Sequence, residues 1–209
     1  MWCLPAGAAI IRLSLWFPAK NEYRMSQSPT PAEVWRVYEE SDCIHSAEAV
    51  EAAFDRMAVA LTERLHNLNP LVICVLHGGL VTSGRLIPRL NFPLQQDYLH
   101  ATRYGDRTTG GVLDWLARPV SSLEGRHVLL VDDIHDEGTT LAAIVQYCHD
   151  AGAAGVVTAA LANKLHDRKQ GRRADIHGLD VPDRFVFGCG MDYKGYLRNL
   201  PGIHALRDH

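Results

Sequence analysis

The sequence has no long apolar run, no paired cysteines and no excess of one charge. None of its apolar stretches reaches the ~18 residues that a membrane-spanning helix needs. Its five cysteines are scattered without a C-x-x-C pair, which disfavours a disulfide framework or a zinc finger and fits a reducing cytosol. With 21 Lys and Arg against 24 Asp and Glu, it lacks the positive field of a non-specific nucleic-acid binder. We therefore expect a cytoplasmic protein that binds neither membranes nor nucleic acid.

The length and composition fit one globular domain. Of the 209 residues, 47% are hydrophobic and 22% charged, which argues against disorder. Residues 1–24 contain an apolar stretch broken by Arg12, with no Lys or Arg before it, unlike a secretory signal. We expect residues 1–24 to be an extension outside the fold and residues 25–209 to form a single domain, because Met25 opens a polar stretch typical of a soluble chain. A signal peptide, a membrane tether and an ordered extra element are the alternatives for residues 1–24.

Apolar spacing after residue 31 predicts alternating helices and strands. Steps of three and four predict amphipathic helices over 47–67, 80–90 and 139–151. Short Val- and Ile-rich runs are typical of strands buried in a parallel sheet, and they lie at 71–76, 128–131, 156–161 and 184–187. Residues 97–103 and 112–117 are predicted as two strands that flank an exposed loop over 104–111. The fold class is α/β, with an open, mainly parallel sheet flanked by helices.

The segment VDDIHDEGTTL (131–141) carries the strongest chemical signal. Asp132 and Asp133 end a buried strand, where open α/β sheets bind ligands, and carboxylates can accept hydrogen bonds from a diol or bind Mg²⁺. Gly138 permits a close approach of the backbone, and Thr139 and Thr140 open a helix whose free N–H groups bind phosphate. Phosphate donors beside diol acceptors fit a ribose 5-phosphate.

This segment resembles the phosphoribosyl pyrophosphate signature of the type I phosphoribosyltransferases. Residues 46–206 resemble the hypoxanthine-guanine members: VLHGGL (75–80) is similar to their pyrophosphate loop, and ATRYGDRTTGG (101–111) to their mobile active-site loop. DRFVFGCGMDYKGYLRNLPGI (183–203) is similar to their closing segment. The resemblance implies the type I phosphoribosyltransferase fold, a small hood from the N- and C-terminal segments, and a homo-dimer or homo-tetramer.

The resemblance also assigns site residues. It implies that Asp136 exchanges a proton with ring nitrogen 7 of the purine as the catalytic group, and that a cis peptide bond precedes His77. Many members have Lys or Arg where this chain has His77, so we expect the backbone N–H groups of Gly78 and Gly79 to bind the pyrophosphate. The implied phosphoribosyl pyrophosphate ligands are Asp132, Asp133, Asp136, Glu137, Gly138, Thr139, Thr140, His77, Gly78, Gly79 and Arg198. The purine-binding residues are Lys164, Phe185, Val186 and Asp192, the mobile-loop residues are Arg103 and Tyr104, and the Mg²⁺ ligands are Asp132, Asp133 and Asp192.

The resulting hypothesis is an enzyme of purine salvage. It transfers the 5-phosphoribosyl group from phosphoribosyl pyrophosphate to hypoxanthine, with guanine as a second substrate, and gives IMP or GMP and pyrophosphate. One alternative is a regulator of the same fold, but residues 1–46 show no helix-turn-helix and no clustered Lys or Arg. The other alternative is a transferase for another nucleobase, xanthine or a pyrimidine. Lys164 and the DRFVFG segment disfavour a pyrimidine. The remaining histidines, His135, His204 and His209 among them, show no metal-ligand spacing and are expected at the surface.

Overall fold

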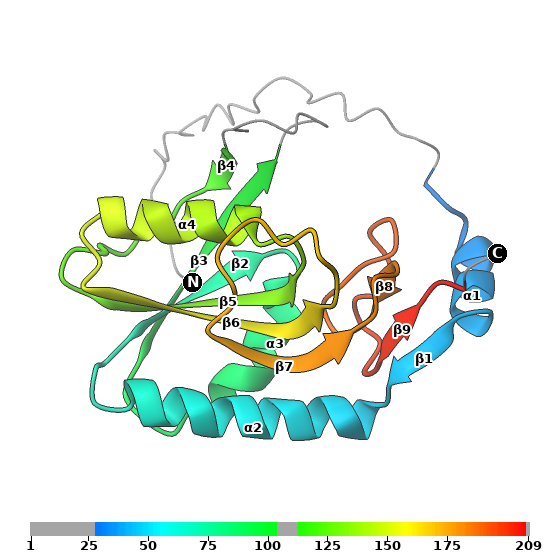
Figure 1. The fold of residues 1–209 in the computed structure, drawn as a ribbon, viewed down its shortest axis with the longest axis horizontal. Coiled ribbons are helices and arrows are strands. Elements are labelled where there is room, and N and C mark those ends of the chain that lie inside the picture. The colour runs from blue at the N-terminus through cyan, green and yellow to red at the C-terminus, as the bar shows by residue number, and fades with distance from the viewer. Residues whose placement is uncertain (1–27, 104–112, 208–209) are drawn as a thin grey trace, which may run out of the picture.

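A computed structural model describes residues 28–103 and 113–207, so the expectations for residues 1–24 and for the whole 104–111 loop, Tyr104 included, lie outside the described part of the chain, as does His209. Its main element is a six-stranded sheet in the order β4-β3-β2-β5-β6-β7 (Figure 1). The strands are β2 (Leu71–Leu76), β3 (Gln95–Arg103), β4 (Leu113–Ala117), β5 (His127–His135), β6 (Gly155–Lys164) and β7 (Ile176–Val181). All neighbours pair in parallel except β4, which is antiparallel to β3.

Helices cover both faces of this sheet (Figure 1). The helices α2 (Ala47–Leu65) and α3 (Gly79–Leu86) pack on one face, and α4 (Thr139–Asp150) packs on the other. A 3₁₀ turn, η1 (Ile87–Arg89), continues α3. No helix in the described ranges is long and apolar enough to cross a membrane.

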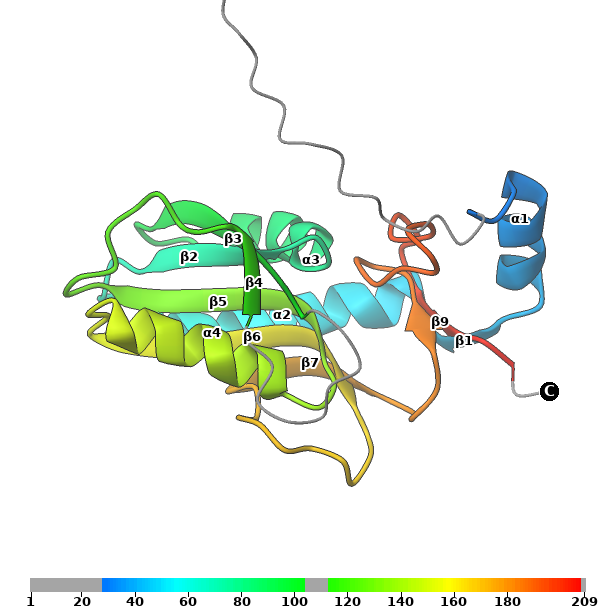
Figure 2. The ribbon, with the colours of Figure 1, turned by 90° about the horizontal axis from the view of Figure 1, so that it is seen from above.

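A second, smaller sheet forms the expected hood. Its three antiparallel strands are β1 (Asp42–His45), β9 (Ile203–Ala205) and β8 (Val186–Phe187), in that order, and α1 (Pro31–Glu39) precedes them. It lies beyond the end toward which β5, β6 and β7 point (Figures 1 and 2). Asp42 of β1 accepts a hydrogen bond from Arg184 at 2.7 Å and another from Arg207 at 3.0 Å. The hood therefore joins the N-terminal and C-terminal parts of the described chain.

The structure confirms most predicted elements and corrects some. The run 184–187 is not a strand of the parallel sheet: only residues 186–187 are strand, and they pair with β9 in the hood. The composition of an apolar run does not determine which sheet the strand joins. The predicted strand 128–131 is longer, since β5 continues to His135, so Asp132 and Asp133 lie within the strand and not after it.

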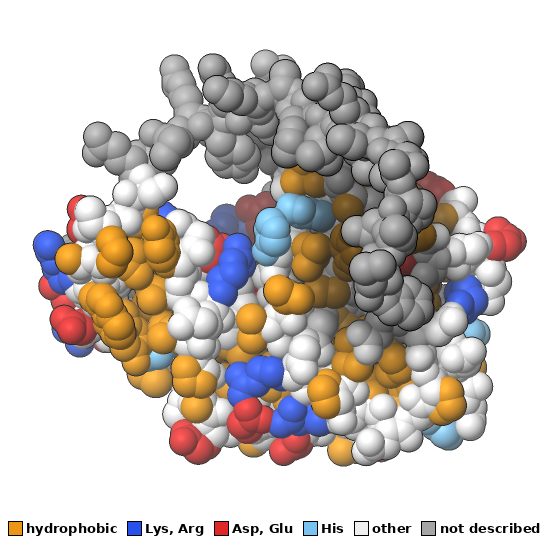
Figure 3. Space-filling model, turned by 180° about the vertical axis from the view of Figure 1, so that it is seen from behind, with side chains coloured by type: hydrophobic (Ala, Val, Ile, Leu, Met, Phe, Trp, Pro, Cys, Tyr) orange, Lys and Arg blue, Asp and Glu red, His pale blue; other side chains and the backbone are white. Residues whose placement is uncertain are grey.

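One face of α2 is buried in the core, and the opposite face is exposed. Val50, Phe54 and Leu61 are completely buried in a core cluster that also contains residues of β2, β5, β6 and β7, whereas Val59 on the opposite side of the helix is 61% exposed. Seen from behind, the surface has apolar side chains among charged ones, with Lys or Arg next to Asp or Glu at its lower edge (Figure 3). Burial of one helix face is thus a main source of stability.

We expect Val50→Ala to lower the free energy of unfolding by about 2 kcal/mol, because two methyl groups leave a closed core and a cavity remains. Val59→Ala in the same helix is the matched control. It should change stability by less than ~0.5 kcal/mol, since the side chain is already exposed and Ala favours helix. Urea unfolding followed by circular dichroism measures both. Equal losses in the two variants would contradict the packing described here.

Candidate functional site

Most of the predicted site residues lie around one pocket at the carboxyl end of the parallel strands. The pocket has a volume of about 450 Å³ and is open to solvent. The predicted residues that line it are Gly78, Asp132, Asp133, Asp136, Glu137, Gly138, Thr139, Thr140, Asp192 and Arg198. They come from the end of β5, the start of α3, the start of α4 and the segment after β8. The fold thus brings together residues that are as much as 120 positions apart in the sequence (198 − 78 = 120).

Two adjacent carboxylates form the floor of the pocket. Burial raises the pKa of Asp132 well above its ordinary value, and the neighbouring charge of Asp133 raises it further. Burial also raises the pKa of Asp133, although an Arg198 nitrogen lies 3.8 Å from one of its oxygens. A cation or hydroxyl donors in the pocket would favour the ionised form of both carboxyls over the protonated form. This donor pair fits a divalent ion that takes its remaining ligands from a substrate and from water.

Asp192 has partners other than a metal. One of its oxygens lies 2.6 Å from an Arg198 nitrogen, and the other accepts a 2.6 Å hydrogen bond from the backbone of Gly195. Within the described ranges, no group of three or more His, Cys, Asp and Glu side chains is arranged to hold a metal ion. A bound ion would therefore depend on ligand oxygens to complete its coordination.

The phosphate loop (residues 136–140) connects β5 to α4. Gly138 caps α4 with a φ of +81°, a left-handed conformation that favours glycine. A Cβ at this position would lie 2.7 Å from the Arg172 carbonyl oxygen and 2.7 Å from His135 Nε2. The loop therefore presents the free N–H groups at the start of a 12-residue helix to the pocket.

The pyrophosphate loop (residues 75–80) has the conformation that the resemblance implied. The Leu76–His77 peptide bond is cis. A Cβ at Gly78 would overlap the Asp133 carboxylate, and a Cβ at Gly79 would lie 2.5 Å from the Val131 carbonyl oxygen. Glycine at both positions is thus required by the neighbouring β5 strand.

The imidazole of His77 lies away from the contacts that Gly78 and Gly79 make with β5. The side chain is exposed, does not line the pocket, and packs edge-to-face on His100 with the ring centroids 4.3 Å apart. Burial, and then the charge of His77, lower the pKa of His100. The structure therefore places the backbone of the loop, and not this side chain, at the pocket.

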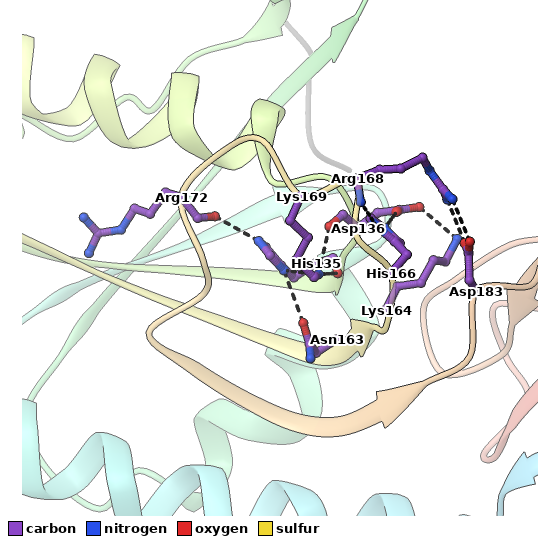
Figure 4. Close-up of polar contacts among 9 residues, drawn as sticks. All are labelled: His135, Asp136, Asn163, Lys164, His166, Arg168, Lys169, Arg172 and Asp183. Carbon is purple, nitrogen blue, oxygen red and sulfur yellow. Dashed lines mark hydrogen bonds and ion pairs between the residues drawn. The ribbon is translucent and has the colours of Figure 1, made fainter.

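Asp136 is held by two partners that come from the end of β6. Lys164 Nζ donates to Oδ2 at 2.8 Å, and His166 Nε2 lies 2.6 Å from Oδ1 (Figure 4). Burial raises the pKa of the Asp136 carboxyl, but the hydrogen bonds from Lys164 and His166 outweigh burial, and the pKa lies below its ordinary value. The carboxylate is thus ionised and fixed in orientation, as a proton acceptor at neutral pH needs to be.

No sequence motif indicated a role for His166, and the expectation that His135 lies at the surface is wrong. Both side chains are buried, at 2% and 3% exposed, and both contact the phosphate loop or the connection that packs on it. His135 has Nε2 2.9 Å from the carbonyl oxygen of Arg172, so it is not a surface residue. For His166, the available signal was its place two residues after Lys164, at the end of a strand that leads to the pocket.

Three other predicted residues, Phe185, Val186 and Arg103, do not line the pocket. Phe185 is 50% exposed, with its ring edge-to-face on Tyr193 at 6.0 Å, and Val186 is buried in β8. An exposed aromatic face is available for stacking on a planar ligand. Arg103 is the last residue of β3, and the structure describes its backbone but not its side chain.

Comparisons with known proteins agree with this geometry. The family model described as phosphoribosyl transferase domain matches residues 40–194. The chain is 33% identical over 163 residues to the hypoxanthine-guanine phosphoribosyltransferase of Bacillus subtilis, covering 78% of this chain and 91% of that one. It is 29% identical over 189 residues to the hypoxanthine-guanine-xanthine phosphoribosyltransferase of Tritrichomonas foetus, covering 88% and 98%.

Solved structures show the same relationship. A hypoxanthine phosphoribosyltransferase from Staphylococcus aureus superposes with a TM-score of 0.76 at 25% identity, covering 81% of this chain and 94% of that chain. A hypoxanthine-guanine-xanthine phosphoribosyltransferase superposes with a TM-score of 0.73 at 27% identity, covering 81% and 99%. This chain therefore belongs to the type I phosphoribosyltransferases of the hypoxanthine-guanine kind.

Proposed function

We propose that this protein transfers the 5-phosphoribosyl group of phosphoribosyl pyrophosphate to hypoxanthine and to guanine, which gives IMP or GMP and releases pyrophosphate. One observation carries the proposal: the ionised Asp136, the first residue of the phosphate loop, is held by Lys164 at the pocket that contains the acidic pair. This arrangement supplies a phosphate site, a diol site and a proton acceptor within one pocket of about 450 Å³. The relatives named above support the same reaction.

Phosphoribosyl pyrophosphate would bind along the end of β5. The 5-phosphate accepts hydrogen bonds from the N–H groups at the start of α4, and Thr139 and Thr140 add hydroxyl donors. Asp132 and Asp133 accept hydrogen bonds from the ribose hydroxyls or hold a magnesium ion there. Mg²⁺, when bound, offsets the negative charge that develops on the leaving pyrophosphate. Backbone N–H groups of Gly78 and Gly79 stabilise the same leaving group.

The purine would bind between the phosphate loop and the hood. Phe185 stacks on the ring, the backbone of Val186 meets its edge, and Lys164 donates to the 6-oxo oxygen. Lys164 already contacts Asp136, so it has to share that contact with the purine or give it up. Asp136 accepts the proton from ring nitrogen 7 as the bond to ribose forms.

The direct test is to incubate the protein with phosphoribosyl pyrophosphate, Mg²⁺ and each nucleobase in turn, and to identify the nucleotide formed. We expect IMP and GMP with stoichiometric pyrophosphate. Xanthine belongs in the same series, because the Tritrichomonas foetus relative is named for all three bases. Binding of phosphoribosyl pyrophosphate without nucleotide formation from any base would point to the regulator and overturn the proposal.

Asp136→Asn should lower kcat by about 10²-fold or more, because the amide cannot accept the proton in the transition state. The affinity for phosphoribosyl pyrophosphate should change little, since the phosphate donors are backbone groups and hydroxyls. Single-turnover kinetics and isothermal titration of phosphoribosyl pyrophosphate measure the two effects separately. An unchanged rate of the chemical step would remove Asp136 from the mechanism.

Gly78→Val should abolish pyrophosphate binding, because its Cβ would overlap the Asp133 carboxylate and displace the loop. His77→Ala should weaken binding only modestly, since the exposed imidazole is not at the pocket. Gly84→Val is the matched control in α3, where a Cβ meets no atom within 4 Å. Pyrophosphate inhibition constants decide among the three. A loss at His77→Ala as large as at Gly78→Val would show that the imidazole makes the contact.

A further inference from the structure

The β6–β7 connection (residues 165–175) packs against the outer side of the phosphate loop (Figure 4). The backbone N–H groups of Gln170 and Gly171 both donate to the Glu137 carbonyl oxygen at 3.1 Å. Lys169 Nζ donates to the carbonyl oxygens of Asp136 at 2.9 Å and His135 at 3.2 Å. The conformation of the phosphate loop is thus supported by the protein itself on the side opposite the pocket.

His166 of this connection is a buried group that reaches the Asp136 carboxylate. Its side chain is 2% exposed, whereas the side chain of Asp136 is 43% exposed. The backbone N–H of Arg168 donates to His166 Nδ1 at 3.0 Å, so Nδ1 is the accepting nitrogen and the proton is on Nε2. Nε2–H then donates to Asp136 Oδ1 at 2.6 Å. A neutral imidazole is therefore fixed as a donor to this oxygen.

The side chain of Arg168 is itself held in place. Its guanidinium makes two parallel 2.7 Å hydrogen bonds to Asp183, which lies just before β8 (Figure 4). A two-bond contact of this kind sets the orientation of the guanidinium as well as its position. Asp183 thereby anchors Arg168, the residue whose backbone N–H orients His166.

Lys164 and His166 hold different oxygens of Asp136, and this difference separates their roles. In the proposed function Lys164 turns to the 6-oxo oxygen of the purine, and Oδ2 becomes free to meet ring nitrogen 7. His166 stays on Oδ1, because the imidazole is buried and its Nδ1 is occupied. We propose that His166 is a positioning residue that holds the Asp136 carboxylate in the orientation for proton transfer. The inference rests on the proposed function of Asp136.

Charged groups around Asp136 remain when His166 is replaced. Lys164 faces it from the end of β6, Arg168 and Lys169 face it from the connection, and Glu137 follows it in the chain. The hydrogen bond from His166 is one of the contacts that lower the pKa of Asp136. Loss of that bond raises this pKa, so a larger fraction of the carboxyl is protonated at a given acid pH. The acid limb of kcat/KM for the purine should then move to higher pH.

The test compares His166→Asn with His166→Gln in the full chain. The Asn amide can accept from the Arg168 N–H but is too short to reach Asp136, whereas the Gln amide places a donor where Nε2 lies. We expect His166→Asn to lower kcat/KM for hypoxanthine by about 10-fold and to move the acid limb upward. His166→Gln should stay within about 3-fold of the wild type with an unmoved limb. The KM for phosphoribosyl pyrophosphate should be unchanged in both.

Failure of this inference can be distinguished from failure of the proposed function. A wild-type protein that makes no nucleotide would overturn the proposed function. An Asp136→Asn variant with full activity would remove Asp136 from the mechanism, and the role of His166 with it. If the wild type is active and Asp136→Asn is not, equal activity and equal pH profiles for His166→Asn and wild type would overturn the role of His166, as would equal losses in the Asn and Gln variants. In the Asp136→Asn background, His166→Asn should cause no further loss, because the residues act as a unit. A full additional 10-fold loss there would show that His166 acts elsewhere.

Discussion

The burial of two adjacent carboxylates at the end of the central strand is the constraint around which the site is built. Asp133 leaves no room for a side chain at Gly78, and Gly190 approaches the same place with its Cα facing the Gly78 carbonyl oxygen and Asp133. Arg198 supplies a nearby positive charge. Gly78, Asp133 and the 190–198 segment, which are distant in the sequence, therefore meet at one place, and the Asp133 carboxylate requires glycine at position 78.

Much of this arrangement could be predicted from local sequence. The buried strand β2, the amphipathic α2 and the Gly-Thr-Thr start of α4 each have a pattern of their own, and the acidic pair follows an apolar run. Strand β7 (Ile176–Val181) was missed because its burial is uneven and its sequence, IHGLDV, mixes polar and apolar residues. Strand β8 was assigned to the wrong sheet because only its pairing with β9, and not its composition, decides where it lies.

The contacts around Asp136 could not be predicted for a different reason. Lys164 and His166 are close to each other in sequence but 28 and 30 positions from Asp136, so no local pattern links them to it. Their position depends on how the β6–β7 connection folds back over the phosphate loop. In the proposed function, the substrate binds a phosphate loop whose conformation is set by the β6–β7 connection. Substitutions in this connection can therefore change the activity although the connection does not line the pocket.

The pairing of β1 with β9 bears on how the chain acquires activity during synthesis. Asp42 is opposite Ala205 in the register, and the contact closes a loop of more than 160 residues (205 − 42 = 163). Loops of that length close late, and a ribosome exposes β9 only after the whole parallel sheet has emerged. The sheet, with its acidic pair and phosphate loop, can therefore fold first on local and parallel contacts. The hood is completed afterwards, because its last strand is synthesised after the whole parallel sheet.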